Sequence, residues 1–375
     1  MNILINCSNL KKGGALQVAD SVCQLLNRFP DFNFFVVLSD QLSRTETIIK
    51  KYKNVSVFNY NITNHPLTLF LGRDSFLDNL VSDQNIDVVL TIFGPSRWSP
   101  RVAHIAGFAR PHLVLSDSPF YQRFNIFERL KHSIHNALLS YFFQRKTQYF
   151  YTENSFISSR LAKKFKKAHI ETITNYYNQV FDDPKKWIAT DIPEFNGLDL
   201  LIVSANYPHK NIPICLEIVK KAKSIQKEIR FILTIDEKDF PSVPPELKNN
   251  FLFLGAVSIE QCPYLYSICD IVFQPSLLEC FTATYAEAMI MKKPIITTDL
   301  GFAHSLCGNA ALYYSPLSAD SALKAITHLS EDPQLVSTLI ANGSKQLRNF
   351  DDYQKRATKL IRYCELVAKK EIISV

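Results

Sequence analysis

Two glutamates, Glu279 and Glu287, stand eight positions apart in the stretch ECFTATYAEAM. The apolar run DIVFQPS precedes Glu279, and Glu287 falls about one turn into the helix predicted after Thr282. Both acids are therefore expected near the carboxyl end of a buried strand, beside the free N–H groups of a helix start. Carboxylates bind sugar hydroxyls and a helix start binds phosphate, so the pair could hold a sugar joined to a nucleotide diphosphate. The alternative is a solvated acid followed by an acidic helical turn.

A lysine in the stretch LIVSANYPHKN could serve the same chemistry. The stretch predicts a strand ending near Ser204, a turn fixed by Pro208 and a helix opening at Lys210. Lys210 would place a cation at the mouth of the site, where phosphates and carboxylates otherwise repel each other. Asn206 and His209 lie in the same loop and are candidate binding residues. An ordinary exposed lysine is the alternative.

Two stretches in the first half of the chain could complete such a site. Gly13 and Gly14 lie in a strand-to-helix turn, where glycine lets backbone amides approach a ligand closely. A plain tight turn explains the same pair nearly as well. The stretch HIAGFARPHLVLSDSPFY offers His104 and His112, and for each the alternative is a histidine satisfied within the fold.

The elements that must position these residues form two successive series of strands alternating with helices. Residues 1–190 run from NILINC to IETITNYYN, and residues 191–350 run from LDLLIVSAN to AALYYSP. Such alternation is typical of parallel sheets covered by helices on both faces. The polar stretch NQVFDDPKKWIATDIPEFNG predicts a linker between the two series. We expect an α/β protein with two Rossmann-like doubly wound domains facing each other across a cleft, in which the ligand lies.

The length of the chain agrees with this division, because 375 residues suit two domains of about 190 residues each. The remaining segment, residues 351–375, predicts an amphipathic helix. Its apolar face must pack on one of the two domains, and packing back on the amino-terminal domain is the arrangement that we consider.

The cysteines and the amino terminus indicate where the protein works. Eight cysteines are scattered through apolar runs without a C-x-x-C pair or a Cys/His metal spacing, so buried reduced thiols are expected. The start MNILINCSNL lacks the basic and apolar regions of a signal peptide, and no apolar run of about 18 residues predicts a spanning helix. We therefore expect a cytoplasmic protein without a bound metal.

The positive charge is concentrated in one segment. The net charge is +7, and residues 101–167 alone hold 12 basic and 3 acidic side chains. Within residues 120–146, aromatic residues cluster at both ends and apolar residues recur every four positions from Ile126 to Phe142. This segment is either an interfacial helix on an anionic membrane surface or a core helix with a solvated basic face. A nucleic-acid partner is not expected, because no RRM, KH or zinc-finger pattern is present.

The stretch that begins at Pro275 resembles the retaining glycosyltransferases of the family 4 type, which have the GT-B fold. Their signature contains Pro-Ser, Glu, Phe-Gly, Glu-Ala-Met, a glycine two residues before proline, an aspartate after a strand, and Cys-Gly-Asp-Ala-Ala. The matching residues, in order, are Pro275, Ser276, Glu279, Phe281, Glu287, Ala288, Met289, Pro294, Asp299, Cys307, Gly308, Ala310 and Ala311. The chain departs from the signature at Thr282, Lys292, Ser305 and Asn309.

The resemblance implies roles for the residues of the second domain. Glu279 would bind hydroxyls of the donor sugar, and Glu287 would bind the ribose hydroxyls. The backbone around Cys280, Phe281 and Thr282 would face the diphosphate.

The resemblance also covers the two loops described above. Lys210 matches the second member of a basic pair in the family. Ala205 stands at the position of the first member, an arginine, and His209 is the candidate substitute for its charge. Gly13 and Gly14 match the glycine loop of the family's first domain.

We therefore predict a nucleotide-sugar-dependent hexosyltransferase that retains the anomeric configuration and needs no metal or cofactor. Catalysis would rest on Lys210, Glu279 and His104, which we favour over His112 as the histidine near the donor sugar. The acceptor would be a hydroxyl of a glycan or lipid-linked glycan in surface polysaccharide or lipopolysaccharide assembly, at the inner face of the membrane. Two other functions stay open: a nucleotide-sugar 2-epimerase of the same architecture, and a catalytically silent sugar-nucleotide-binding protein, suggested by Ala205.

Overall fold

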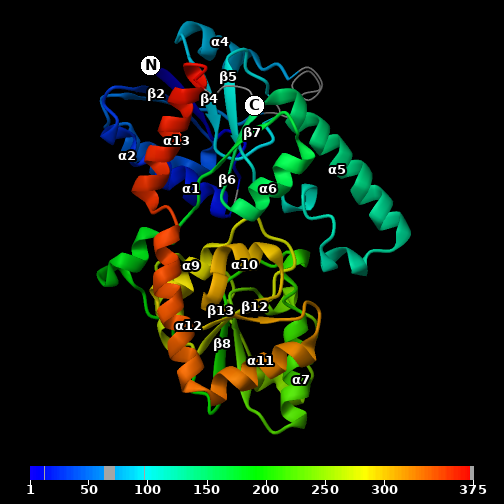
Figure 1. Ribbon diagram of the computed structural model, residues 1–375. Coiled ribbons are helices and arrows are strands. Elements are labelled where there is room, and N and C mark those ends of the chain that lie inside the picture. The colour runs from blue at the N-terminus through cyan, green and yellow to red at the C-terminus, as the bar shows by residue number, and fades with distance from the viewer. Residues whose placement is uncertain (12, 63–71, 97, 372–375) are drawn as a thin grey trace. The chain divides into compact units, whose positions relative to one another are not determined.

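The computed structural model describes residues 1–11, 13–62, 72–96 and 98–371, and these form two compact units (Figure 1). The first unit comprises Met1–Ser116, Asn125–Asn175 and the chain from Asp351 onward, and the second comprises Asp117–Phe124 and Tyr176–Phe350. Each unit is built around one parallel sheet with helices packed on it. The predicted α/β class with two doubly wound sheets is confirmed, whereas the cleft between the domains stays a prediction.

The sheet of the first unit has seven parallel strands in the order β3-β2-β1-β4-β5-β6-β7. The central strands are apolar along almost their whole length, as expected for strands covered on both faces. The strands are β1 (Asn2–Asn6), β2 (Asn33–Leu38), β3 (Val55–Asn59), β4 (Val88–Thr91), β5 (Ala103–Gly107), β6 (Tyr149–Thr152) and β7 (His169–Thr172).

Two apolar clusters cover the faces of this sheet. On one face, Ile3 and Ile5 of β1 pack with α1 and α13, and on the other face Leu4 and Val89 pack with α4. The helices of this unit are α1 (Gly14–Cys23), α2 (Ser43–Ile49), α4 (Ser75–Asp83), α5 (Ile126–Lys146), α6 (Ser155–Lys164) and α13 (Tyr353–Ala368).

The carboxyl-terminal helix α13 belongs to the first unit, a question that the sequence left open. Leu360, Cys364 and Val367 are buried in the same cluster as β1. This segment is tied to the first unit by Asp351, which accepts a hydrogen bond from the backbone N–H of Thr174 at 3.0 Å. The first unit therefore combines the two ends of the chain.

The predicted helix over residues 126–146 is α5. It begins at a capping box in which Asn125 and Glu128 each accept the other's backbone N–H, both at 2.9 Å. Its recurrent apolar residues, from Ile126 to Leu138, are more than half exposed. The core-helix alternative is therefore wrong. No helix in the described ranges is long and apolar enough to span a membrane.

The second unit contains six parallel strands in the order β10-β9-β8-β11-β12-β13. The chain leaves β8 toward β9 on one side and later returns to pair β11 with the other side of β8, so the strand order reverses there. The strands are β8 (Leu198–Ile202), β9 (Ile229–Leu233), β10 (Phe251–Phe253), β11 (Ile271–Gln274), β12 (Ile295–Thr298) and β13 (Ala311–Tyr314). The helices are α7 (Ile214–Ser224), α8 (Cys262–Ile268), α9 (Ala283–Ile290), α10 (Gly301–Cys307), α11 (Ala319–Glu331) and α12 (Pro333–Gln346).

The predicted boundary at residue 190 needs correction, because the second unit resumes at Tyr176. The presumed linker contains apolar side chains that pack on this unit. The ring of Phe181 lies 5.7 Å from that of Tyr266, and the backbone N–H of Ile188 donates to the carbonyl of Glu260 at 2.9 Å. The polar composition of this stretch gave no sign of these contacts, so the sequence predicted a linker.

All eight cysteines are buried and none forms a disulfide, in agreement with the expected buried thiols.

One glycine of the first sheet has no room for a side chain. A Cβ at Gly107, the last residue of β5, would lie 2.0 Å from the carbonyl oxygen of Ile92 and 2.6 Å from the ring of Tyr151. At Gly14, by contrast, a Cβ would meet no atom within 4 Å.

We expect Gly107→Ala to destabilise the first unit by about 1 to 3 kcal/mol or more, because backbone and a buried ring must move. In thermal unfolding this corresponds to a decrease of roughly 5 °C or more in Tm. Gly14→Ala is the matched control and should leave Tm nearly unchanged. Equal effects of the two substitutions would contradict the packing described at Gly107.

Candidate active site

The reversal of strand order in the second unit brings two loops together. Strands β8 and β11 are paired through Leu200 with Ile271, so their carboxyl ends lie side by side. The loop after β8 covers residues 203–213, and the loop after β11 covers residues 275–282. Ligands of open α/β sheets bind at such a point.

An ion pair joins the two loops. Lys210 Nζ lies 2.5 Å from Glu279 Oε1, and the two side chains are only 15% and 9% exposed. The backbone N–H of Leu277 also donates to the carbonyl of His209 at 2.8 Å. Two of the three residues that the sequence assigned to catalysis, 69 positions apart, therefore meet in one place.

The loop after β11 is held from the neighbouring strand. Two hydroxyls of β12, those of Thr297 and Thr298, donate to the carbonyls of Gln274 at 3.0 Å and Ser276 at 2.7 Å. The first turn of α9 is tied to the end of β8, since the hydroxyl of Thr284 donates to the carbonyl of Val203 at 3.5 Å. The backbone on both sides of Glu279 is thus held by hydrogen bonds.

A segment distant in sequence packs on these loops. Residues Asp117–Phe124 belong to the second unit, although they lie within the stretch that was predicted as the first domain. Ser118 Oγ donates to the carbonyl of Leu277 at 2.7 Å, and the Arg123 guanidinium donates to Oδ1 of Asn211. Arg123 is a cation beside the Lys210 loop that sequence reasoning missed. Its place in a basic, aromatic segment was the one available signal.

Asn211 completes the turn that orients Lys210. It follows the short 3-10 helix η7 (Pro208–Lys210) and has a left-handed backbone with φ of 55°, which asparagine tolerates better than most residues. The residue is fully buried, and its Nδ2 has no hydrogen-bond partner in the described part of the chain.

His209 is the predicted substitute for the charge of the arginine that is missing at Ala205. Its ring stacks on Tyr207 at 5.6 Å. Burial lowers the pKa of His209, and the opposing effect of the Glu279 charge is smaller. These surroundings disfavour the charged imidazole, and the substitution by His209 stays a prediction.

No described side chain caps the backbone N–H groups at the start of α9. Thr282 is the N-cap residue, and its side chain makes no capping hydrogen bond. Cys280 is buried, and the ring of Phe281 packs edge to face on that of Phe350 at 6.1 Å. Side chains thus anchor the loop while the first N–H groups of α9 remain available for an anion.

Glu287 occupies a separate, apolar position on α9. The hydroxyl of Tyr266, from α8, donates to Glu287 Oε2 at 2.7 Å, and both side chains are buried. Burial raises the pKa of Glu287 to about 7, and the hydrogen bond from Tyr266 offsets only part of this shift. The carboxyl group is therefore poised between its two protonation states near neutral pH.

Of three other predicted residues, Gly13 and Gly14 belong to the first unit, and Asn206 belongs to the Lys210 loop of the second. Gly13 precedes α1 in the first unit with φ of 76°, a backbone conformation that favours glycine, and Gly14 begins the helix. Both are exposed after the carboxyl end of β1. Asn206 donates from Nδ2 to the carbonyl of Asp239 at 2.5 Å, so its amide is engaged with the loop after β9.

His104 lies inside the first sheet rather than at its edge. It is the second residue of β5, is 5% exposed, and contacts the hydroxyl of Thr91 at 2.9 Å through Nε2. The carboxyl end of β5 comes three residues later, at Gly107. His112 lies beyond that end, in the 3-10 helix η3 (Pro111–Leu113). The position of His104 within β5 supports the alternative that it is a histidine satisfied within the fold.

Comparison with known proteins agrees with this geometry. Residues 195–346 match the family model described as glycosyl transferases group 1. The O-antigen chain mannosyltransferase RfbU of Salmonella typhimurium is 31% identical over 143 residues, which are 36% of this chain and 40% of that protein. The alignment thus spans less than half of either protein.

Solved structures match over nearly the whole chain. Sucrose-phosphate synthase of Thermosynechococcus elongatus superposes with a TM-score of 0.69 at 14% identity, covering 98% of this chain and 100% of that one. Anabaena HepE in complex with UDP-glucose gives a TM-score of 0.63 at 16% identity, covering 97% and 99%. At these identities the likeness concerns the fold, and it agrees with the predicted GT-B architecture.

The matched segment contains both loops, the ion pair and Glu287. Over residues 195–346, the chain is therefore similar to the glycosyl transferases group 1 family.

Proposed function

We propose that the protein is a retaining glycosyltransferase that moves a sugar from a nucleotide diphosphate sugar to a hydroxyl of a glycan or lipid-linked acceptor. The observation that carries the proposal is the Lys210–Glu279 ion pair at the reversal of strand order. A cation and a carboxylate meet there beside the uncapped start of α9. These are the groups needed for a diphosphate and for sugar hydroxyls.

Departure of the nucleoside diphosphate leaves negative charge on phosphate. Lys210 and the N–H groups at the start of α9 would stabilise this charge in the transition state. Arg123, which is held by Asn211, adds positive potential near this loop. The Gly13 and Gly14 amides would act from the first unit. With these groups, the reaction would need neither a metal ion nor a cofactor.

The ion pair implies an exchange of partners on donor binding. Without ligand, Glu279 is the counter-ion of Lys210. A bound diphosphate would replace the carboxylate as the partner of Lys210, and Glu279 would turn its oxygens to the sugar hydroxyls. Glu287 would bind the ribose hydroxyls.

The mannosyltransferase relative acts on O-antigen chains, which supports a role for this protein in surface polysaccharide or lipopolysaccharide assembly, with a hexose as the transferred sugar. Nucleotide-sugar donors are synthesised in the cytoplasm, so we place the reaction there, at the inner face of the membrane.

Incubation with a panel of UDP-, GDP- and ADP-sugars distinguishes this function from its two alternatives. Nucleotide release that depends on an added acceptor supports a transferase. Interconversion of the sugar without an acceptor would identify a 2-epimerase, and binding without turnover would identify a silent binder.

Replacement of Lys210 by Ala should lower kcat by about 100- to 1,000-fold, because a group that stabilises the transition-state charge is lost. Lys220→Ala is a suitable control, since Lys220 pairs with Glu217 on the exposed surface of α7. Thermal unfolding of both variants checks that the fold is retained. Unchanged kcat in a folded Lys210→Ala protein would remove Lys210 from the mechanism.

Replacement of Glu287 by Ala should weaken nucleotide binding, as measured by calorimetric titration, if Glu287 binds the ribose. Undiminished affinity would exclude this role.

Glu287→Gln tests how much the ionisation of Glu287 lowers the stability of the folded protein, independently of its role in binding. Below about pH 4.5 the carboxyl is protonated in both the folded and unfolded states. Between about pH 4.5 and 7 only the unfolded state ionises, so wild-type stability falls as pH rises through this window. The loss is on the order of 3 kcal/mol.

We therefore expect Glu287→Gln to match the wild type at about pH 4 and to be more stable at about pH 8. Glu153, whose pKa is likewise raised to about 7 by burial, contributes equally to both proteins and cancels. Thermal unfolding at the two pH values provides the measurement. A stability difference that does not change with pH would contradict a raised pKa of Glu287.

A further inference from the structure

One face of α5 is apolar and more than half exposed to solvent. Six large apolar side chains on this helix are between 53% and 79% exposed, namely Ile126, Phe127, Leu130, Ile134, Leu138 and Tyr141. At 3.6 residues per turn they fall within an arc of about 120° and so form one continuous stripe, here called the α5 stripe. Monomeric soluble proteins rarely expose such a patch without a function.

The opposite side of α5 attaches the helix to the first unit. Asn136 donates to the carbonyl of His112 at 3.0 Å, and the ring of Phe143 lies 5.4 Å from that of Phe108. His132 and Leu139 on this side are half-buried, and Phe143 is buried. The α5 stripe therefore points away from the unit to which the helix is attached.

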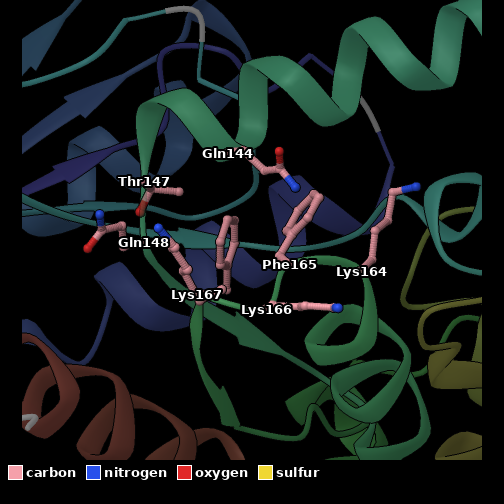
Figure 2. Close-up of a pocket in the computed structure, with 9 residues that line it drawn as sticks. Gln144, Thr147, Gln148, Lys164, Phe165, Lys166 and Lys167 are labelled. Carbon is pink, nitrogen blue, oxygen red and sulfur yellow. The ribbon is translucent and has the colours of Figure 1, made fainter. Parts of the chain in front are cut away.

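A lysine-lined cavity opens at the carboxyl end of the same helix. It has a volume of about 380 Å³ and is lined by Gln144 of α5, by Phe150 and Phe165, and by Lys164, Lys166 and Lys167 (Figure 2). None of the described residues that line it is acidic. Among the residues that the structure describes, these three lysines form no ion pair.

This cavity is distinct from the proposed donor site. Its walls include Thr147 and Gln148, just before β6, and Ala168, just before β7. It therefore lies at the amino ends of these strands, whereas Gly13 and Gly14 follow the carboxyl end of β1 in the same parallel sheet.

We propose that the α5 stripe and the lysine-lined cavity form one docking surface for an anionic phospholipid membrane. The stripe would enter the boundary between headgroups and acyl chains, and the lysines around the cavity would attract phosphate-bearing headgroups. This proposal does not depend on the donor chemistry.

One observation favours a membrane over other occupants. The stripe ends at Tyr141 and the cavity begins at Gln144, so the apolar stripe adjoins a cationic cavity at the carboxyl end of α5. A soluble phosphate would use the lysines without the stripe. A second copy of this chain would cover the stripe and leave the lysine charges unmatched.

Sedimentation with vesicles tests the proposal on the full chain. Wild-type protein should bind vesicles of phosphatidylcholine mixed with phosphatidylglycerol, and binding to phosphatidylcholine alone should be much weaker. Added salt should weaken the binding, because screening reduces the attraction of lysines to the surface. No binding to the mixed vesicles would overturn the proposal.

Two sets of substitutions separate the parts of the surface. Leu130→Gln with Ile134→Gln and Leu138→Gln should abolish vesicle binding, and these exposed positions tolerate glutamine in a helix. Lys164→Gln with Lys166→Gln and Lys167→Gln should weaken binding on the order of a hundredfold, at about fivefold per lysine near an anionic surface.

The matched control replaces Lys50, Lys51 and Lys53 by Gln. These lysines are exposed, and their substitution removes the same charge as substitution of the cavity lysines. They lie at the edge of the sheet formed by β3, whereas the cavity lies beside the other edge, formed by β7. We expect the control to bind vesicles nearly as well as the wild type. An equal loss in the control would show attraction by net charge alone and would overturn the docking surface.

Two further outcomes would also overturn it. One is binding of inorganic phosphate that depends on the three cavity lysines in a protein that does not bind vesicles. The other is a dimer, detected by light scattering, that dissociates when the stripe is substituted. Nucleotide binding in solution should be unchanged in all variants, so failure of docking and failure of the proposed enzymatic function are distinguishable.

Discussion

The reversal of strand order between β8 and β11 is the constraint on which the candidate site depends. Parallel strands that diverge from this point leave their carboxyl ends adjacent, with no crossing helix between them. The loop that carries Lys210 and the loop that carries Glu279 must therefore meet, whatever their detailed conformation. The hydroxyls of β12 and the segment Asp117–Phe124 then fix these loops further.

Each member of the ion pair requires the other as its counter-ion. Each partner is largely withdrawn from water, so removal of either would leave the other with an uncompensated charge. Such a pair contributes little net stability, but it holds a cation and a carboxylate ready in one place. In the proposed reaction the donor provides new partners for both groups, and charge neutrality is maintained throughout. Glu287 shows a related arrangement, since a buried carboxyl is retained at a cost to stability above neutral pH.

Much of the second unit could be predicted from sequence because its signals are local. Strand–loop–helix patterns place Lys210 and Glu279 at strand ends, and neighbouring strand ends meet. The contact of Ser118 and Arg123 with these loops could not be predicted, because it joins segments far apart in the chain. The position of His104 within β5 could not be predicted, because a polar residue does not show whether it lies within a strand or after it. The lowered pKa of His209 depends on burial, which composition does not reveal.

The return of the chain to the first unit affects how that unit is made. Strand β1 and helix α13 share one apolar cluster, yet nearly the entire polypeptide separates them. During synthesis on the ribosome, Ile3 and Ile5 emerge long before Leu360 and Val367. Part of the core of the amino-terminal sheet therefore stays uncovered until α13 has been synthesised, whereas the second unit, whose chain is nearly continuous, can reach its final packing first.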